Sequence, residues 1–256
     1  MFHYNTFLGL HQGPEPLFLA NCWDVQSAKL LETAGYPAIG FSSHAISTAF
    51  GYEDGERLPF DLLLRTAKRV VESINVPFTV DMEGGFSRTI DGILANIDKL
   101  VDAGVAGINL EDTIAGTSRE LQPAKDFARI IAAIANHLEK NNRKLFVNIR
   151  TDGFLLDLPT ALSETLTRIK IYANAGAGGI FVPCISGRND IEQVVAATPL
   201  PVNVMVIPGL PDWETIRQLG VSRVSMGPFL FSKVYEHAAT IAKTVWEQKD
   251  LRPLLS

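Results

Sequence analysis

Short runs of Val, Ile, Leu and Phe alternate along the chain with longer segments in which apolar residues recur at helical spacing. The short runs predict strands, and the longer segments predict helices that cross back over a sheet. This alternation favours βα units around a parallel sheet. We expect eight strands, at 17–21, 38–43, 78–82, 106–112, 145–152, 179–184, 202–206 and 222–227.

Helical patterns separate and follow these runs, at 24–34, 59–74, 89–103, 124–140, 158–175, 188–197, 212–219 and 229–248. Four of the helix ends carry a glycine just before the link to the next strand, which predicts left-handed caps at Gly35, Gly104, Gly176 and Gly220. Eight strand–helix pairs in 256 residues predict an α/β fold, a single-domain (β/α)8 TIM barrel over residues 1–256.

The competing architecture is an open, doubly wound sheet, which normally carries a glycine-rich phosphate turn after its first strand. In this chain the run LFLAN is followed by CWDVQS, which contains no glycine. The first turn therefore favours the closed barrel over a dinucleotide-binding sheet.

Charge and cysteine content exclude several classes of protein. The formal net charge is −5 and there is no basic run, so we expect no binding to nucleic acid or to an anionic membrane. Cys22 and Cys184 lie far apart and form no CxxC motif, which is typical of a reducing compartment. The first residues lack the pattern of a signal peptide, and no apolar run is long enough to span a bilayer. We expect a cytoplasmic protein.

Carboxylates follow two neighbouring strands, at the end of a βα barrel where active sites form. Asp81 and Glu83 are expected to face together because residues i and i+2 of a strand share a side, and Glu111 ends the next strand. Three hard oxygen donors without a histidine predict a Mg²⁺ site, with Mn²⁺ as the alternative metal. Acids at these positions also cap helices, an interpretation that we keep open for Asp112 and Asp152.

Two further groups of polar residues follow strands. Arg150 has a planar fork that suits a substrate carboxylate and equally suits a buried partnership with Asp152 or Glu111. The hydroxyl and backbone N–H groups of Ser42, Ser43 and His44 are suited to holding an anionic oxygen. A lone histidine such as His44 is more typical of a structural residue than of a catalyst.

Taken together, these stretches resemble the isocitrate lyase/phosphoenolpyruvate mutase superfamily, in particular its short members similar to carboxyphosphonoenolpyruvate phosphonomutase. The matching segments are ANCWDVQSAKLLETAGYPAIGFSS, GYEDGE, TVDMEGG, AGINLED, NIRTD and PVNVMVIPGLPDWETIRQLGVSRVSMGP. The resemblance implies that Asp81, Glu83 and Glu111 surround Mg²⁺ largely through water. It implies substrate binding by Ser42, Ser43, His44, Arg150 and Asn203, with catalytic roles for Asp54, Arg150, His44 and the loop residue Ser118.

The resemblance also implies chemistry through an enolate. It predicts a Mg²⁺-dependent lyase-type enzyme that cleaves a C–C bond of a small 2-oxo or 2-hydroxy carboxylate, oxaloacetate-like or alkylmalate-like. The K-K-C-G-H motif of the lyase branch is absent, and the segment 113–122 is shorter than the mutase gating loop, so the proton donor stays open. Within that segment Gly116 is a candidate pivot, and Ser118 and Arg119 are placed to reach an anion.

Two alternatives remain beside this prediction. The first is P–C bond chemistry of the phosphonopyruvate hydrolase or phosphoenolpyruvate mutase type. The second is a catalytically silent homologue that binds a 2-oxo acid.

The last predicted helix carries apolar residues on more than one face, including Phe231, Val234, Tyr235 and Trp246. One interpretation is a helix packed on its own barrel. The resemblance implies instead that the last helix is exchanged between subunits. On that basis we expect residues 229–256 to serve in a homodimer or homotetramer.

Overall fold

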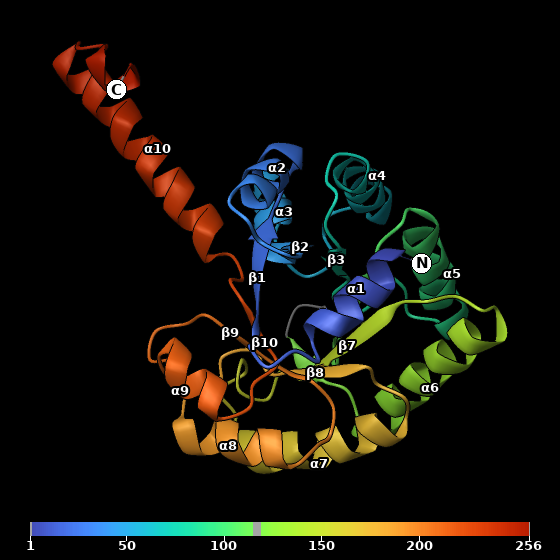
Figure 1. The fold of residues 1–256 in the computed structure, drawn as a ribbon. Helices are drawn as coiled ribbons and strands as arrows, with labels where there is room; N and C mark the ends of the chain where they lie inside the picture. Colours follow the sequence, from blue (N-terminus) through green and yellow to red (C-terminus); the bar gives the residue numbers. More distant parts are fainter. Residues whose placement is uncertain (1, 115–118, 256) are drawn as a thin grey trace.

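The structure is a computed structural model that describes residues 2–114 and 119–255 (Figure 1). Within these residues, eight parallel strands close into a barrel in the order β1-β10-β9-β8-β7-β4-β3-β2. The closed barrel confirms the predicted fold and all eight predicted strands. The barrel strands are β1 (Leu17–Cys22), β2 (Ile39–Phe41), β3 (Phe78–Asp81), β4 (Gly107–Glu111), β7 (Phe146–Arg150), β8 (Gly179–Phe181), β9 (Val202–Met205) and β10 (Arg223–Ser225).

The eight predicted helices are present within about three residues of the expected bounds. They are α2 (Val25–Thr33), α4 (Phe60–Val71), α5 (Ile90–Asp102), α6 (Ala124–Lys140), α7 (Ala161–Asn174), α8 (Arg188–Ala196), α9 (Trp213–Gln218) and α10 (Phe229–Gln248). Except for α10, they surround the barrel (Figure 1). The four predicted cap glycines all have positive φ, between 79° and 100°, which confirms the left-handed helix ends.

Two helices were not predicted from the sequence. The first is α1 (Phe2–Leu10), whose Phe7 is fully buried against Phe146 in a small apolar cluster. The second is α3 (Ser43–Ala49), a seven-residue helix that follows β2 directly. Both are short, and α3 consists largely of small and polar residues, so neither carries the apolar period on which helix prediction depends.

Smaller elements complete the structure. An antiparallel pair, β5 (Thr113–Ile114) and β6 (Glu120–Leu121), follows the end of β4. A short 3-10 helix, η1 (Arg252–Leu254), follows α10 near the end of the chain. No helix among the described residues is long and apolar enough to cross a membrane.

The inside of the barrel is layered. Leu17, Leu19 and Phe7 belong to a small apolar cluster that is separate from the main hydrophobic core. Asn109, Asn148, Asn203 and Arg223 form a buried layer of linked hydrogen bonds. The main hydrophobic core lies between the strands and the surrounding helices. A polar layer inside the barrel places fixed donors and acceptors below the ends of the strands.

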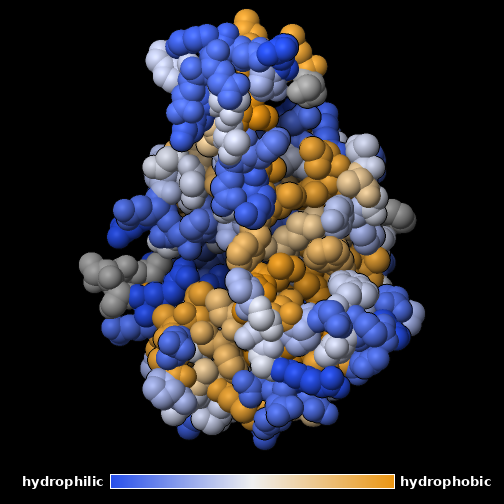
Figure 2. Space-filling model, turned by 90° about the vertical axis from the view of Figure 1, so that its left-hand side faces the viewer, coloured by the Kyte–Doolittle hydropathy of each residue, from blue (hydrophilic) through white to orange (hydrophobic). Residues whose placement is uncertain are grey.

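The helix α10 extends away from the barrel (Figure 1), and Phe231 near its start is its one buried residue. Val234, Tyr235 and Trp246 are 44%, 51% and 73% exposed. Figure 2 shows apolar surface gathered between this projecting helix and the barrel below it. In a single chain, α10 therefore does not pack along its own barrel, contrary to the first interpretation of its sequence.

Candidate active site

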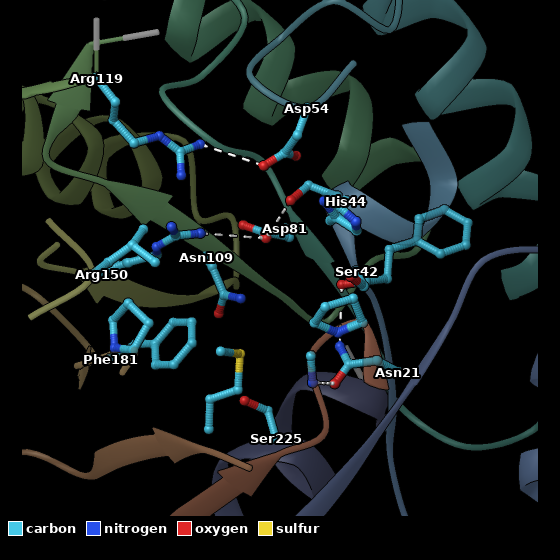
Figure 3. Close-up of a pocket in the computed structure, with 17 residues that line it drawn as sticks. Asn21, Ser42, His44, Asp54, Asp81, Asn109, Arg119, Arg150, Phe181 and Ser225 are labelled. Atoms are coloured by element: carbon cyan, nitrogen blue, oxygen red, sulfur yellow. Dashed lines mark hydrogen bonds and ion pairs between the residues drawn. The ribbon is translucent and has the colours of Figure 1, made fainter. Parts of the chain in front are cut away.

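A cavity of about 170 Å³ lies at the carboxyl ends of the strands (Figure 3). At about 30 Å³ per liquid water, this is the volume of five or six water molecules. The cavity thus has room for a small molecule. Among the predicted site residues, those that line it are Ser42, Ser43, His44, Asp54, Asp81 and Arg150.

Asp81, the last residue of β3, is the central acid of this cavity. Its Oδ2 accepts a hydrogen bond from Ser43 Oγ at 2.8 Å and lies 3.8 Å from Arg150 Nη1. Its Oδ1 is buried and has no hydrogen-bond partner among the residues that the structure describes. Burial raises the pKa of Asp81, although Arg150 and Ser43 act in the opposite direction.

Glu111 ends β4 and pairs in register with Arg150 on β7. Its side chain is fully buried: Oε1 accepts from Thr113 Oγ1 at 2.6 Å, and Oε2 lies 3.0 Å from Arg150 Nη1 without hydrogen-bond geometry. Burial raises the pKa of Glu111 to about 7, against the effect of Arg150. Glu111 lies close to Arg150 but does not line the cavity.

Glu83 lies beyond the end of β3, with its backbone in the left-handed region at φ 48°. The strand alternation thus ends before Glu83, and its buried carboxylate does not line the cavity beside Asp81. Glu83 Oε2 accepts from the backbone N–H of Glu56 at 2.6 Å. Burial and the negative charges of Asp54, Asp81 and Glu111 raise the pKa of Glu83 to about 9.

These acids suit a hard divalent cation. Burial and neighbouring negative charges raise the pKa of Asp81, Glu83 and Glu111, and within the described part of the chain one oxygen each of Asp81 and Glu111 lacks a hydrogen bond. A bound cation would lower these pKa values through its positive charge and would coordinate the oxygens that lack a hydrogen bond. Among the described residues no three Asp, Glu, His or Cys side chains form a ready set of direct ligands. The chemistry of these acids fits a hard divalent cation.

Arg150 adopts the buried partnership that its sequence context left open. Nε donates to Asp152 Oδ1 at 2.6 Å and Nη2 donates to Asp152 Oδ2 at 3.1 Å. The remaining nitrogen, Nη1, faces Glu111 and Asp81. Asp152 engages two of the three guanidinium nitrogens, Nε and Nη2. Arg150 therefore presents only Nη1 to the cavity.

Asp112 and Asp152 are not helix caps, so that alternative is wrong for both. The residue before α6 is Pro123 and the residue before α7 is Thr160. Asp112 instead accepts hydrogen bonds from Tyr172, Arg168 and the backbone N–H of Asp152, at 2.8, 3.1 and 3.1 Å. Asp112 thereby fixes the position of Asp152, and Asp152 fixes Arg150.

The mouth of the cavity is bounded by Asp54 and Arg119 (Figure 3). Arg119 Nη2 lies 3.6 Å from Asp54 Oδ2 and 3.5 Å from Glu111 Oε1. His44 lines the cavity and is exposed. The predicted catalytic residue Ser118 and the predicted pivot Gly116 lie outside the described residues.

Two predicted substrate residues make contacts within the protein. Ser42 caps α3, accepting from the backbone N–H of Ala45 at 3.3 Å. Asn203 is buried in the polar layer and does not line the cavity. Its Nδ2 donates to the backbone carbonyl of Val204 at 2.6 Å. The structure thus places Ser42 in the cavity wall and Asn203 outside the lining.

Several cavity residues were not selected from the sequence, among them Asn21 and Asn109. Asn21 joins three strand ends, donating to the carbonyl of Phe41 and accepting from the N–H of Gly227. Asn109 shares a strand face with Glu111, two residues later, and this alternation was the signal available in the sequence.

Comparison with known proteins identifies the family. A sequence model of the family described as Phosphoenolpyruvate phosphomutase matches residues 7–246. The chain belongs to this family. It is therefore a member of the isocitrate lyase/phosphoenolpyruvate mutase superfamily of lyases and mutases, in agreement with the resemblance of its strand ends.

Family relatives differ in their described activities. An uncharacterized protein of Mycobacterium tuberculosis is 32% identical, covering 96% of this chain and 91% of its own length. The 2-methylisocitrate lyase of Bacillus subtilis is 26% identical, covering 77% of this chain and 64% of its own length. A structure of a putative phosphonomutase from Burkholderia cenocepacia has a TM-score of 0.89 at 34% identity, covering 95% of this chain and all of that chain. Family membership thus establishes the class of enzyme and not its reaction.

Proposed function

We propose that the chain is a Mg²⁺-dependent lyase-type enzyme that cleaves a C–C bond of a small 2-oxo or 2-hydroxy carboxylate, oxaloacetate-like or alkylmalate-like. The observation that carries this proposal is the acid cluster at a small cavity, where Arg150 Nη1 lies 3.8 Å from Asp81 Oδ2 and 3.0 Å from Glu111 Oε2 and where Asp81 Oδ1 has no hydrogen-bond partner among the described residues. Family relatives named 2-methylisocitrate lyase and oxaloacetate decarboxylase support the substrate class.

Asp81, Glu83 and Glu111 are the residues that would hold Mg²⁺, or Mn²⁺ in its place. Bound there, the ion supplies positive charge that offsets the negative charge developing on a substrate oxygen as the C–C bond breaks. A structure of phosphonopyruvate hydrolase in complex with oxalate and Mg²⁺ shares the fold, with a TM-score of 0.87 at 19% identity over 98% of this chain and 89% of that chain.

We assign the other predicted residues to substrate and proton. Arg150 Nη1 attracts a substrate carboxylate at the cavity, where Ser42, Ser43 and His44 form the adjoining wall. Asp54 lies at the mouth and is the group to which we assign proton transfer, at Oδ2, which Arg119 faces at 3.6 Å. Arg119 lines the cavity beside Asp54, within reach of an anion bound there, and the catalytic role of Ser118 stays a prediction.

A phosphonate reaction is the second candidate, of the phosphonopyruvate hydrolase or phosphoenolpyruvate mutase type. The family description and the 34% identical putative phosphonomutase favour it. A catalytically silent homologue that binds a 2-oxo acid is the third candidate. The three candidates differ in their products: a keto or carboxylic acid fragment, a phosphorus-containing product, or none.

The test is a substrate panel read by mass spectrometry with purified protein and Mg²⁺. Oxaloacetate, alkylmalates and phosphonopyruvate are each incubated with the wild type and with Asp81→Ala. Fragments from C–C cleavage that require Asp81 support the proposal. Formation of phosphate or phosphoenolpyruvate from phosphonopyruvate would support the phosphonate reaction instead. Absence of any product together with ligand binding supports the third.

We further propose that the protein is a cytoplasmic homodimer or homotetramer in which α10 contacts another subunit. The helix projects from the barrel (Figure 1). Its Tyr235 and Trp246 side chains are more than half exposed. Apolar surface lies beside it in Figure 2. An exposed apolar patch of this kind marks an association surface. The cytoplasmic location fits Cys22 and Cys184, which are free thiols.

A further inference from the structure

The side-chain amides inside the barrel have an orientation that their neighbours dictate. Asn203 Nδ2 donates to two backbone carbonyls, those of Val204 at 2.6 Å and Arg223 at 3.3 Å. A carbonyl oxygen only accepts, so the nitrogen of Asn203 must lie on that side. The oxygen of Asn203 is then the atom that faces Asn148.

The same reasoning orients the next two amides. Asn148 must present its nitrogen to Asn203 Oδ1, at 3.2 Å, and this nitrogen also lies 3.0 Å from Asn109 Oδ1. Arg223 Nη2 donates to the same oxygen of Asn109 at 3.2 Å, and a guanidinium has only donors. Asn109 therefore turns its oxygen toward the barrel interior.

The side-chain nitrogen of Asn109 is therefore directed toward the cavity. Asn109 lines the cavity (Figure 3), and no acceptor for its Nδ2 is found in the described part of the chain. Asn109 pairs in register with Asp81 across β3 and β4. An N–H₂ donor thus lies next to the central acid of the site and offers an anionic ligand a hydrogen bond there.

Arg223 strengthens this arrangement. It is 1% exposed, and no carboxylate within residues 2–114 and 119–255 lies within ion-pair distance of it. Among the described residues its Nε and Nη1 have no hydrogen-bond partner, so the bond to Asn109 is the one hydrogen bond found there for the guanidinium. A buried, incompletely paired cation polarises the amide that it contacts and favours negative charge beyond it.

We infer that Asn109 is a substrate-binding residue whose side-chain N–H₂ donates to a carboxylate or enolate oxygen at the cavity floor, and that Arg223 is the positioning residue that turns this donor outward. This inference rests on the proposed function, because it takes the ligand to be a small carboxylate. Asn109 then favours ligands that place an oxygen acceptor, rather than a hydrogen-bond donor, next to its side-chain nitrogen in the cavity.

The decisive variant is Asn109→Asp, which keeps the shape and gives Arg223 a charged partner while replacing the outward donor by an acceptor. We expect unchanged or higher thermal stability, unchanged or tighter Mn²⁺ binding in a paramagnetic titration, and Mg²⁺-dependent oxalate affinity lowered at least about tenfold in calorimetry. Asn189→Asp, at an exposed position of α8, adds the same charge and should bind oxalate like the wild type.

Oxalate binding by Asn109→Asp at wild-type affinity would overturn the inference while leaving the proposed function intact. If the wild type itself binds no oxalate with Mg²⁺, the proposed function fails and the inference falls with it. Should Asn109→Asp fail to fold, Asn109→Ser decides: its shorter hydroxyl still accepts from Arg223 but does not reach the ligand, so the same loss is expected.

The positioning role of Arg223 has its own readout. Arg223→Met removes one of the two donors to the Asn109 oxygen, leaving only Asn148, and we expect weaker oxalate binding with Mn²⁺ affinity unchanged. Arg223→Lys restores a cationic donor and should recover most of the oxalate affinity. Equal oxalate binding by Arg223→Met and the wild type would exclude this role.

Discussion

Arg150 and Asp152 form a two-point buried pair, with Nε donating to Oδ1 at 2.6 Å and Nη2 donating to Oδ2 at 3.1 Å. Both side chains are at least nine-tenths buried. The pair fixes the guanidinium in a single orientation, with Nη1 toward Glu111 and Asp81. The positive charge of Arg150 is therefore already oriented at the cavity before a ligand binds.

Breaking this pair should be costly. Asp152→Asn removes the charged acceptor and leaves the Arg150 cation buried with a weaker partner, so we expect a loss of about 3 kcal/mol in the free energy of unfolding. Urea denaturation at neutral pH measures it. The matched control is Asp126→Asn, which breaks the exposed pair with Arg129 and should change stability by less than about 1 kcal/mol. Similar losses in both variants would contradict the account.

The barrel was predictable from the sequence because its signals are local. Each strand is a short apolar run, and glycine ends such as Gly35 and Gly104 mark where helices stop. These features depend on neighbouring residues along the chain. The bounds of the helices α6 and α10 agree with the prediction to the residue.

The site was predictable only in part because side-chain partners come from distant segments. The acids at the ends of β3 and β4 follow from strand alternation, but the reversal of the backbone at Glu83 breaks that alternation. The partnership of Arg150 with Asp152 was one of two open choices. The outward turn of Asn109 depends on Asn148 and on Arg223, which lies 114 residues later. No local pattern records such contacts.

Acid should destabilise the protein through His11. Burial, followed by the charge of Arg223, lowers the pKa of His11 to about 3, whereas the unfolded chain takes up the proton near its ordinary pKa of about 6.5. The contribution of neutral His11 is therefore present above about pH 6.5 and is lost as the pH falls toward 3.

The variant His11→Gln isolates this effect, because the other titrating groups are shared with the wild type. Between pH 7.5 and pH 5.0, the difference in unfolding free energy should shift in favour of the variant by about 2 kcal/mol. Urea denaturation of both proteins at the two pH values measures the shift. A difference that stays constant with pH would show that His11 is not buried in its neutral form.

The projecting helix predicts association. Light scattering should give a mass above the 28.0 kDa of one chain, at least twice that value. Trp246→Glu places a charge at the single tryptophan of α10, which is 73% exposed, and should lower the mass toward that of one chain. Thr240→Glu adds the same charge at an exposed polar position of the helix and should leave the assembly unchanged. A single-chain mass for the wild type would exclude this assembly.

The central claim is that Asp81 and its neighbouring acids form a metal-dependent site for a small carboxylate. The most direct measurement is calorimetric binding of oxalate, with and without Mg²⁺, to the wild type, to Asp81→Ala and to Asp61→Ala, an exposed control on α4. We predict binding that requires both Mg²⁺ and Asp81 and that is unchanged in Asp61→Ala. Oxalate binding of equal strength without Mg²⁺ or in Asp81→Ala, or no binding by the wild type, would contradict the claim.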